Sequence, residues 1–151
     1  MKPSAFDATL PPGLISRAVT AALDEDLGLA GDITTNATVP AQAIARAVIA
    51  ARKPGIVSGL AVAAATFRAV DEGVAFELAV RDGDAVAAGT VIAKIDGSAR
   101  AILTGERVAL NFMGRMSGIA TLTRSYVEAI AGTKATIVDT RKTTPGLRAF
   151  E

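Results

Sequence analysis

The chain contains 151 residues, of which 50% are hydrophobic, and its formal net charge is +1. This length supports one core of ordinary size, and the near-neutral balance gives no reason to expect a nucleic-acid or membrane partner. The sequence has no cysteine and no histidine, which excludes disulfides, Cys/His zinc sites and any Ser-His or Cys-His catalytic pair.

The first predicted element is a helix that follows a proline-rich start. Met1–Pro12 has no apolar run of signal-peptide length, so a cytoplasmic protein is expected. Gly28 is placed to end the helix. Asp24, Glu25 and Asp26 near this end point in different directions, so we expect them to face solvent rather than to chelate a metal. The apolar positions at helical spacing are Leu14, Ile15, Ala18, Val19, Ala22, Leu23 and Leu27.

The middle of the chain predicts a small antiparallel β unit together with one helix. A strand is expected over Ala45–Ala51, and apolar residues alternate with period two from Val74 to Val80. Turns are predicted at Asp82-Gly83-Asp84 and at Asp96-Gly97, with another strand between them. The helix that precedes Asp71 carries the apolar residues Leu60, Ala64, Phe67 and Val70.

The stretch from Asp82 to Ile92 is similar to half of a biotinyl or lipoyl carrier domain. A carrier requires an exposed lysine at a hairpin tip, whereas Lys94 lies inside a predicted strand. Turn-forming glycines explain the same stretch without any cofactor. A carrier function is therefore a minor alternative, although the β architecture is retained.

Helical spacing returns beyond Ser98, and two successive helices are predicted, the second closed by Gly132. Ala135–Asp139 is predicted to be a short buried strand, and a loop begins at Arg141. A strand, a loop and a helix start at Pro145 look like the opening of an alternating β/α series. The apolar stripes are Ala109, Phe112, Met113 and Met116 on the first helix and Ile119, Leu122, Tyr126 and Ile130 on the second.

Basic residues collect in this last third. Residues 100–151 hold eight Lys and Arg against four Asp and Glu, which suits an anionic ligand or a solvated basic face. Arg107 and Asn111 form a polar strip on one helix face. Arg141 and Lys142 follow the predicted strand, where α/β barrels place their chemistry. An arginine fork beside a lysine suits a carboxylate or a phosphate.

Several motifs stand in a fixed order: Glu25-Asp26-Leu27-Gly28, Gly31-Asp32-Ile33-Thr34-Thr35, Glu106-Arg107-Val108-Ala109-Leu110-Asn111, Ser117-Gly118-Ile119-Ala120-Thr121 and Asp139-Thr140-Arg141-Lys142-Thr143-Thr144-Pro145-Gly146-Leu147-Arg148. Together they resemble the quinolinate phosphoribosyltransferase family, also called nicotinate-nucleotide pyrophosphorylase (carboxylating). The last motif, with its Thr-Arg-Lys-Thr-x-Pro-Gly core, is the most specific.

The resemblance implies two domains. Residues 1–115 would form an α+β N-terminal domain with a small barrel-sandwich-like β unit. Residues 116–151 would form a linker helix and the first strand of a truncated α/β barrel, because a complete barrel needs about 200 residues or more. The family reaction joins quinolinate to the ribose of phosphoribosyl pyrophosphate, with loss of pyrophosphate and carbon dioxide. It uses Mg²⁺, whose ligands are expected outside this chain.

By the same resemblance, Arg107, Arg141 and Lys142 bind quinolinate, Lys142 is also catalytic, and Thr140 and Thr143 add hydroxyl donors. Arg107 is expected to reach the barrel of a neighbouring subunit in a homodimer or a higher homo-oligomer. The chain alone is expected to be inactive. The alternatives are a non-catalytic binding or dimerisation module and a pyrophosphorylase-like paralogue associated with molybdenum transport.

Overall fold

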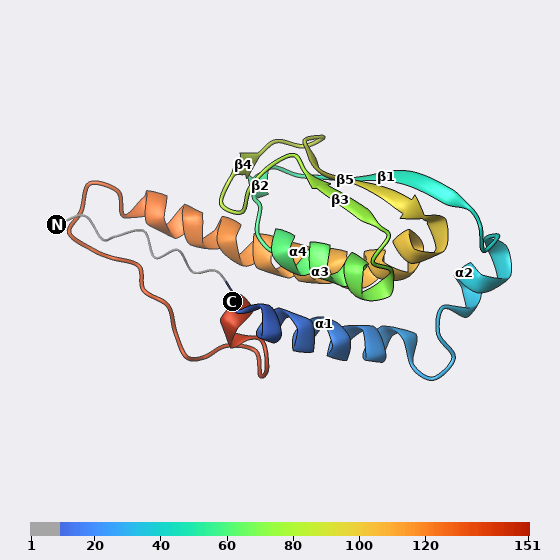
Figure 1. Ribbon diagram of the computed structural model, residues 1–151. Coiled ribbons are helices and arrows are strands. Elements are labelled where there is room, and N and C mark those ends of the chain that lie inside the picture. The colour runs from blue at the N-terminus through green and yellow to red at the C-terminus, as the bar shows by residue number, and fades with distance from the viewer. Residues whose placement is uncertain (1–9) are drawn as a thin grey trace.

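A computed structural model describes residues 10–151, so most of Met1–Pro12, the stretch expected to lack a signal peptide, lies outside the described residues. Figure 1 shows a small sheet above a layer formed by α3 and α4, with α1 below that layer. The elements are α1 (Pro12–Leu27), α2 (Ile33–Thr38), β1 (Ile44–Ala50), β2 (Gly55–Ile56), α3 (Leu60–Val70), β3 (Ala75–Leu78), β4 (Ala85–Val86), β5 (Val91–Ser98), α4 (Ala99–Ala129) and the 3-10 helix η1 (Arg148–Phe150).

The sheet has β5 at its centre, with β1 and β3 antiparallel on either side. Ile95 of β5 lies opposite Ala47 on one side and Phe76 on the other. Exposed and half-buried residues alternate along β1, so one face of the sheet meets the helices while the other meets solvent. The predicted small antiparallel β unit is therefore confirmed. A second antiparallel pair joins β2 and β4.

The predicted first helix and its end are also confirmed. Helix α1 begins with Pro12 in its first turn and is followed by Gly28, which has a φ of 52°. Ile15, Val19 and Leu23 are buried, which is the apolar face expected from their spacing.

Helix α4 is one continuous helix of 31 residues, not the two helices that the sequence predicts. The hydroxyl oxygen of Ser98 accepts a hydrogen bond from the backbone N–H of Ala101 and so caps its start. Helix α4 passes without a break through Gly114 and Gly118 and through the expected domain boundary after residue 115. A glycine in a helix costs only about 1 kcal/mol, which packing on both sides of α4 offsets. None of the helices between residues 10 and 151 is long and apolar enough to cross a membrane.

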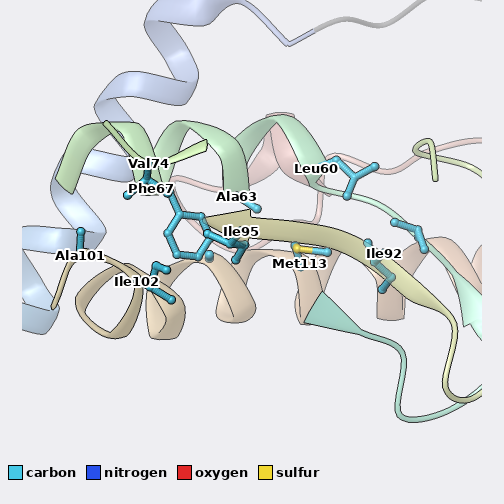
Figure 2. Packing of buried hydrophobic residues seen from close by; sticks show 11 residues of the cluster. Leu60, Ala63, Phe67, Val74, Ile92, Ile95, Ala101, Ile102 and Met113 are labelled. Atoms are coloured by element: carbon cyan, nitrogen blue, oxygen red, sulfur yellow. The ribbon is translucent and has the colours of Figure 1, made fainter. Parts of the chain in front are cut away.

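The main hydrophobic core lies between the sheet, α3 and α4. In Figure 2 the side chain of Phe67 on α3 lies close to Ile95 on β5 and Ile102 on α4. The rings of Phe67 and Phe76 are stacked, with centroids 5.6 Å apart. A second core cluster joins α1 to the outer side of α3 and α4 and includes Phe150 of η1. This cluster fixes both α1 and the C-terminal residues on α4.

The turn predicted at Asp96-Gly97 does not form, because both residues lie within β5. Gly97 has a φ of 154°, and a Cβ atom there would lie 3.1 Å from the Cα atom of Val74. The glycine therefore allows β5 and the segment before β3 to approach each other closely. Its role is packing and not chain reversal.

The strand predicted over Ala135–Asp139 does not form either. These residues have no regular structure and are exposed, Val138 to 79%. A strand needs a neighbour to satisfy its backbone N–H and C=O groups, and none of the described strands pairs with this segment. The chain instead runs back beside the start of α1, where η1 packs (Figure 1).

Candidate functional site

Arg107 lies on the exposed side of α4 and faces two carboxylates. Its Nε atom is 3.1 Å from Oδ2 of Asp26, and its Nη2 atom is 3.7 Å from Oδ2 of Asp32. The side chain of Asp26 is 25% exposed and that of Asp32 only 8%. Asp24, Glu25 and Asp26 are all exposed, as predicted, but the carboxylate of Asp26 also pairs with Arg107 on α4, which the prediction did not include.

Asp32 is fixed by three other donors besides Arg107. Its carboxylate accepts hydrogen bonds from the backbone N–H of Thr35 at 2.9 Å, the hydroxyl of Thr35 at 2.7 Å and the hydroxyl of Thr104 at 3.2 Å. The backbone N–H of Thr35 contributes most to holding the pKa of Asp32 below its usual value. The carboxylate therefore stays ionised at neutral pH and gives Arg107 a rigid, negatively charged partner.

The guanidinium of Arg107 keeps donors for a further acceptor. Its two ion pairs use Nε and Nη2, and neither uses Nη1. A groove of about 290 Å³ lies nearby, lined by Ala22, Glu25, Asp26, Val108, Asn111 and Phe112. Arg107 and Asn111 are both exposed, so the predicted polar strip is present. Because the two carboxylates orient the guanidinium and neither ion pair uses Nη1, Arg107 is suited to bind an anionic group.

The other predicted site residues lie in the loop after residue 139. The side chains of Arg141 and Lys142 are exposed, and neither forms an ion pair with the residues from 10 to 151. Thr140 accepts a hydrogen bond from the backbone N–H of Lys142 at 3.2 Å. Thr143 accepts one from Nε of Arg148 at 3.3 Å. Both hydroxyls thus help to shape the loop, while the two cations remain accessible.

The structure does not bring Arg107 together with Arg141 and Lys142 within one chain. Arg107 contacts Asp26 near the C-terminal end of α1. The loop that holds Arg141 and Lys142 leads into η1, which lies beside the start of α1 (Figure 1). Two groups of cations are therefore present, one near each end of α1.

Sequence reasoning missed the carboxylates that pair with Arg107 and with Arg115. An aspartate three residues before Thr35 has the spacing of a helix N-cap, so the capping role of Asp32 had a signal in the sequence. The pairs Asp26 with Arg107 and Arg115 with Glu151 had none, because each joins segments far apart in the chain. Thr104 was also missed.

The described residues do not form a magnesium site. From residue 10 to residue 151, no three Asp or Glu side chains come together in a way that could hold a metal ion. Asp26 and Asp32 are already neutralised in part by Arg107.

Comparisons with known families agree with the motif order. A family model described as quinolinate phosphoribosyl transferase, N-terminal domain, matches residues 32–117, and its C-terminal domain counterpart matches residues 119–151. The chain is 46% identical over 130 residues to quinolinate phosphoribosyltransferase (decarboxylating) 1b of Nicotiana tabacum, and this match covers 86% of the chain and 37% of the relative. It is 44% identical over 132 residues to nicotinate-nucleotide pyrophosphorylase (carboxylating) of Mycobacterium leprae, with coverages of 86% and 46%.

Solved structures give the same result. NadC from Streptococcus pyogenes superposes with a TM-score of 0.89 at 40% identity, covering 94% of this chain and 50% of that one. Nicotinate-nucleotide pyrophosphorylase from Francisella tularensis has a TM-score of 0.89 at 32% identity, with the same coverages. The chain therefore spans about half, or less, of the length of the proteins that it matches.

Proposed function

The chain belongs to the quinolinate phosphoribosyl transferase family, and on this premise we propose that the longer protein carrying it makes nicotinate mononucleotide. The reaction transfers the phosphoribosyl group of phosphoribosyl pyrophosphate to quinolinate, with release of pyrophosphate and carbon dioxide. Because the chain covers only part of its relatives, we expect it to be inactive by itself.

The observation that carries the proposal is the pair of accessible cation groups. Quinolinate has two carboxylates, and each needs fixed donors in an enclosed site, where a charge-assisted hydrogen bond contributes about 1.5–3 kcal/mol. Arg107 and Arg141 are suited to clamp these carboxylates with their forks. Lys142 would supply a point charge between quinolinate and the phosphoribosyl donor, and Thr140 and Thr143 would add hydroxyl donors.

The separation of the two groups favours a site shared between subunits. Arg107 lies at one end of α1, whereas the loop with Arg141 and Lys142 lies at the other (Figure 1). We therefore infer that Arg107 of one subunit completes the site of another in a homodimer or a larger assembly. In such a symmetric dimer the same contact would occur twice.

The fixed cations suit the charge changes of the reaction. The ring nitrogen of quinolinate forms a bond to the ribose carbon as the bond from that carbon to pyrophosphate breaks, and positive character builds on the ribose. The carboxylate next to the ring nitrogen then leaves as carbon dioxide, and its electron pair remains on the ring until a proton replaces it. Pre-set cations such as Arg141 and Lys142 would stabilise these states without reorganisation.

The remainder of the longer protein would complete the architecture. We infer that residues 1–115 belong to an N-terminal domain and that residues 116–151 open an α/β barrel. In that setting residues 135–139 would pair with neighbouring strands and become the first barrel strand. Magnesium would be held by residues outside this chain.

Turnover by the longer protein tests the proposed function. With phosphoribosyl pyrophosphate and Mg²⁺, we expect consumption of quinolinate and release of carbon dioxide, and we expect Lys142→Ala to abolish both. Arg68→Ala, which removes an exposed arginine on α3, is the matched control and should be active. Robust turnover of nicotinate with none of quinolinate would reject the proposal.

One observation favours a second candidate, a module for assembly. Leu122, Tyr126 and Val127 on α4 are 58%, 57% and 46% exposed, and an apolar surface of this kind tends to find a partner. A longer protein that assembles through this surface yet turns over no pyridine carboxylate would favour this candidate over the enzyme.

A further inference from the structure

The loop that contains Arg141 and Lys142 has no regular structure, yet hydrogen bonds restrain it at several points. Arg148 closes it from within, since its Nη2 atom donates to the carbonyl oxygen of Arg141 at 3.2 Å and its Nε atom donates to the hydroxyl of Thr143 at 3.3 Å. These bonds set the shape of the loop. They do not fix its position on the rest of the protein.

Glu151 and Arg115 connect the loop to α4. Oε2 of Glu151 accepts a hydrogen bond from the backbone N–H of Thr144 at 2.9 Å. Oε1 of the same side chain accepts from Nε of Arg115 at 2.7 Å and also from Nη2. Nη2 of Arg115 donates to the hydroxyl of Thr144 as well. Three side chains from three segments are thus joined in one polar cluster.

Hydrophobic packing keeps Glu151 in this place. The neighbouring residue Phe150 is buried, and its ring centroid lies 5.6 Å from that of Phe112 on α4. Phe112 and Arg115 are on the same helix. Because Phe150 packs against Phe112, the next residue, Glu151, is held close to Arg115.

The cluster differs from the ordinary surface ion pairs of the chain. The side chain of Glu151 is 10% exposed and that of Arg115 is 47% exposed. In the pair between Arg46 and Asp96 the corresponding fractions are 91% and 49%. An exposed pair contributes little to stability. Glu151 instead accepts three donors with limited access to water, where charge-assisted bonds are stronger.

We propose that Arg115 and Glu151 are positioning residues that fix the loop of residues 140–147 on α4, so that Arg141 and Lys142 are presented in place for an anionic substrate. The functional part of this inference rests on the proposed function. Holding the loop before binding reduces the conformational entropy lost when the anion is bound. Neither Arg115 nor Glu151 has to touch the substrate.

Hydrogen exchange on the 151-residue chain tests the positioning directly. The variants are Glu151→Gln and Arg115→Gln, with Asp96→Asn as the matched control that neutralises one carboxylate of an arginine pair. We expect the hydrogen-bonded backbone amides of this loop, those of Lys142, Thr144 and Leu147, to exchange about tenfold faster in the two variants, the size of change that loss of a charge-assisted hydrogen bond produces. Exchange in α1 and α3 should be unaltered, and the control should match the wild type.

Unchanged exchange of residues 140–147 in both variants would overturn the inference. The double variant adds a second criterion, because residues that act through one cluster give non-additive effects. We expect Arg115→Gln combined with Glu151→Gln to exchange no faster than the faster single variant. Fully additive acceleration would contradict a shared cluster.

Kinetics of the longer protein then separate this inference from the proposed function. If both are right, Glu151→Gln raises the KM for quinolinate by about tenfold with a smaller change in kcat, because the loop is less often in place. Arg115→Lys, which keeps one donor, should restore part of the loss relative to Arg115→Gln. Faster exchange of the loop without any quinolinate turnover in the wild type would refute the proposed function, while the positioning by Arg115 and Glu151 would stand.

Discussion

Arg107 and Asp26 meet across the interface of α4 and α1, with Nε of the arginine 3.1 Å from Oδ2 of the aspartate. Through this contact, Asp26 at the end of α1 holds the side chain of Arg107 in place. Together with Asp32 it holds the guanidinium from one edge and leaves Nη1 for another acceptor. The acidic residues near Arg107 therefore orient the side chain that we propose binds quinolinate.

We expect Asp32 to act on stability through its hydrogen bonds more than through its charge. Asp32→Ala removes the cap of α2 and leaves the donors of Thr35 and Thr104 without their acceptor, so it should cost about 1–3 kcal/mol. Asp32→Asn keeps a capping oxygen and should cost less than about 1 kcal/mol at neutral pH. Urea denaturation at neutral pH measures both. An equal loss in the two variants would contradict the capping role.

The same residue gives a pH dependence with a defined sign. Its folded pKa lies below the ordinary value of 3.8, so ionised Asp32 favours the folded state. This contribution is complete above 3.8 and is lost as the pH falls through the lower folded pKa. When the free energy of unfolding is measured at decreasing pH, that of Asp32→Asn should therefore decrease less steeply than that of the wild type. An equally steep decrease in the variant would show that Asp32 does not contribute to the loss of stability in acid.

Two glycines on α4 should respond to alanine in opposite directions. A Cβ atom on Gly105 would lie 3.0 Å from Cδ1 of Phe67, whereas one on Gly114 would meet no atom within 4 Å. Gly105→Ala should destabilise the fold by about 1–3 kcal/mol through overpacking. Gly114→Ala should stabilise it by about 0.5–1 kcal/mol, because alanine loses less backbone entropy in a helix. Thermal and urea unfolding measure both, and a tolerated alanine at 105 would contradict the described packing on Phe67.

In the longer protein, Arg141→Ala should weaken the binding of quinolinate far more than the binding of phosphoribosyl pyrophosphate. Loss of a forked donor to a carboxylate costs about 2 kcal/mol or more. Separate titrations of the two ligands give the comparison, with Arg68→Ala as the control for loss of an exposed arginine. Equal weakening of both ligands would place Arg141 elsewhere in the site.

The 151-residue chain by itself should associate and show no turnover. Leu122 and Tyr126 on α4 are more than half exposed, as is Val138 in the segment after it. Such exposed apolar side chains are expected to pack against another chain. Sedimentation velocity over a range of concentrations should show association, and Leu122→Lys with Tyr126→Lys should reduce it. Leu78→Lys, an equivalent change on the sheet, is the control. A clean monomer at high concentration, or turnover like that of the longer protein, would contradict this expectation.

The elements that local patterns specify were predictable from the sequence. Helical spacing and Gly28 located α1, and the alternation after Val74 located β3. The continuity of α4 through Gly114 was not predictable, because it depends on packing from both sides that outweighs a weak local preference. The position of Gly97 inside β5 depends likewise on its approach to Val74.

The cations of the candidate site were predictable, but their partners were not. Motif order singled out Arg107, Arg141 and Lys142 as expected binding residues, and these roles stay predictions. The pairing of Asp26 with Arg107 and of Glu151 with Arg115 depends on how α1 and the last residues pack on α4. Residues 135–139 illustrate the reverse case, since a local β pattern without neighbouring strands yields no strand.

Mixing two inactive variants of the longer protein tests whether Arg107 and Lys142 belong to one quinolinate site formed by two subunits. Arg107→Ala and Lys142→Ala should each be inactive alone. Subunit exchange between them should restore about a quarter of wild-type turnover, because half of randomly formed dimers are mixed and one of their two sites is intact. A mixture that exchanges subunits yet stays inactive would contradict the shared site.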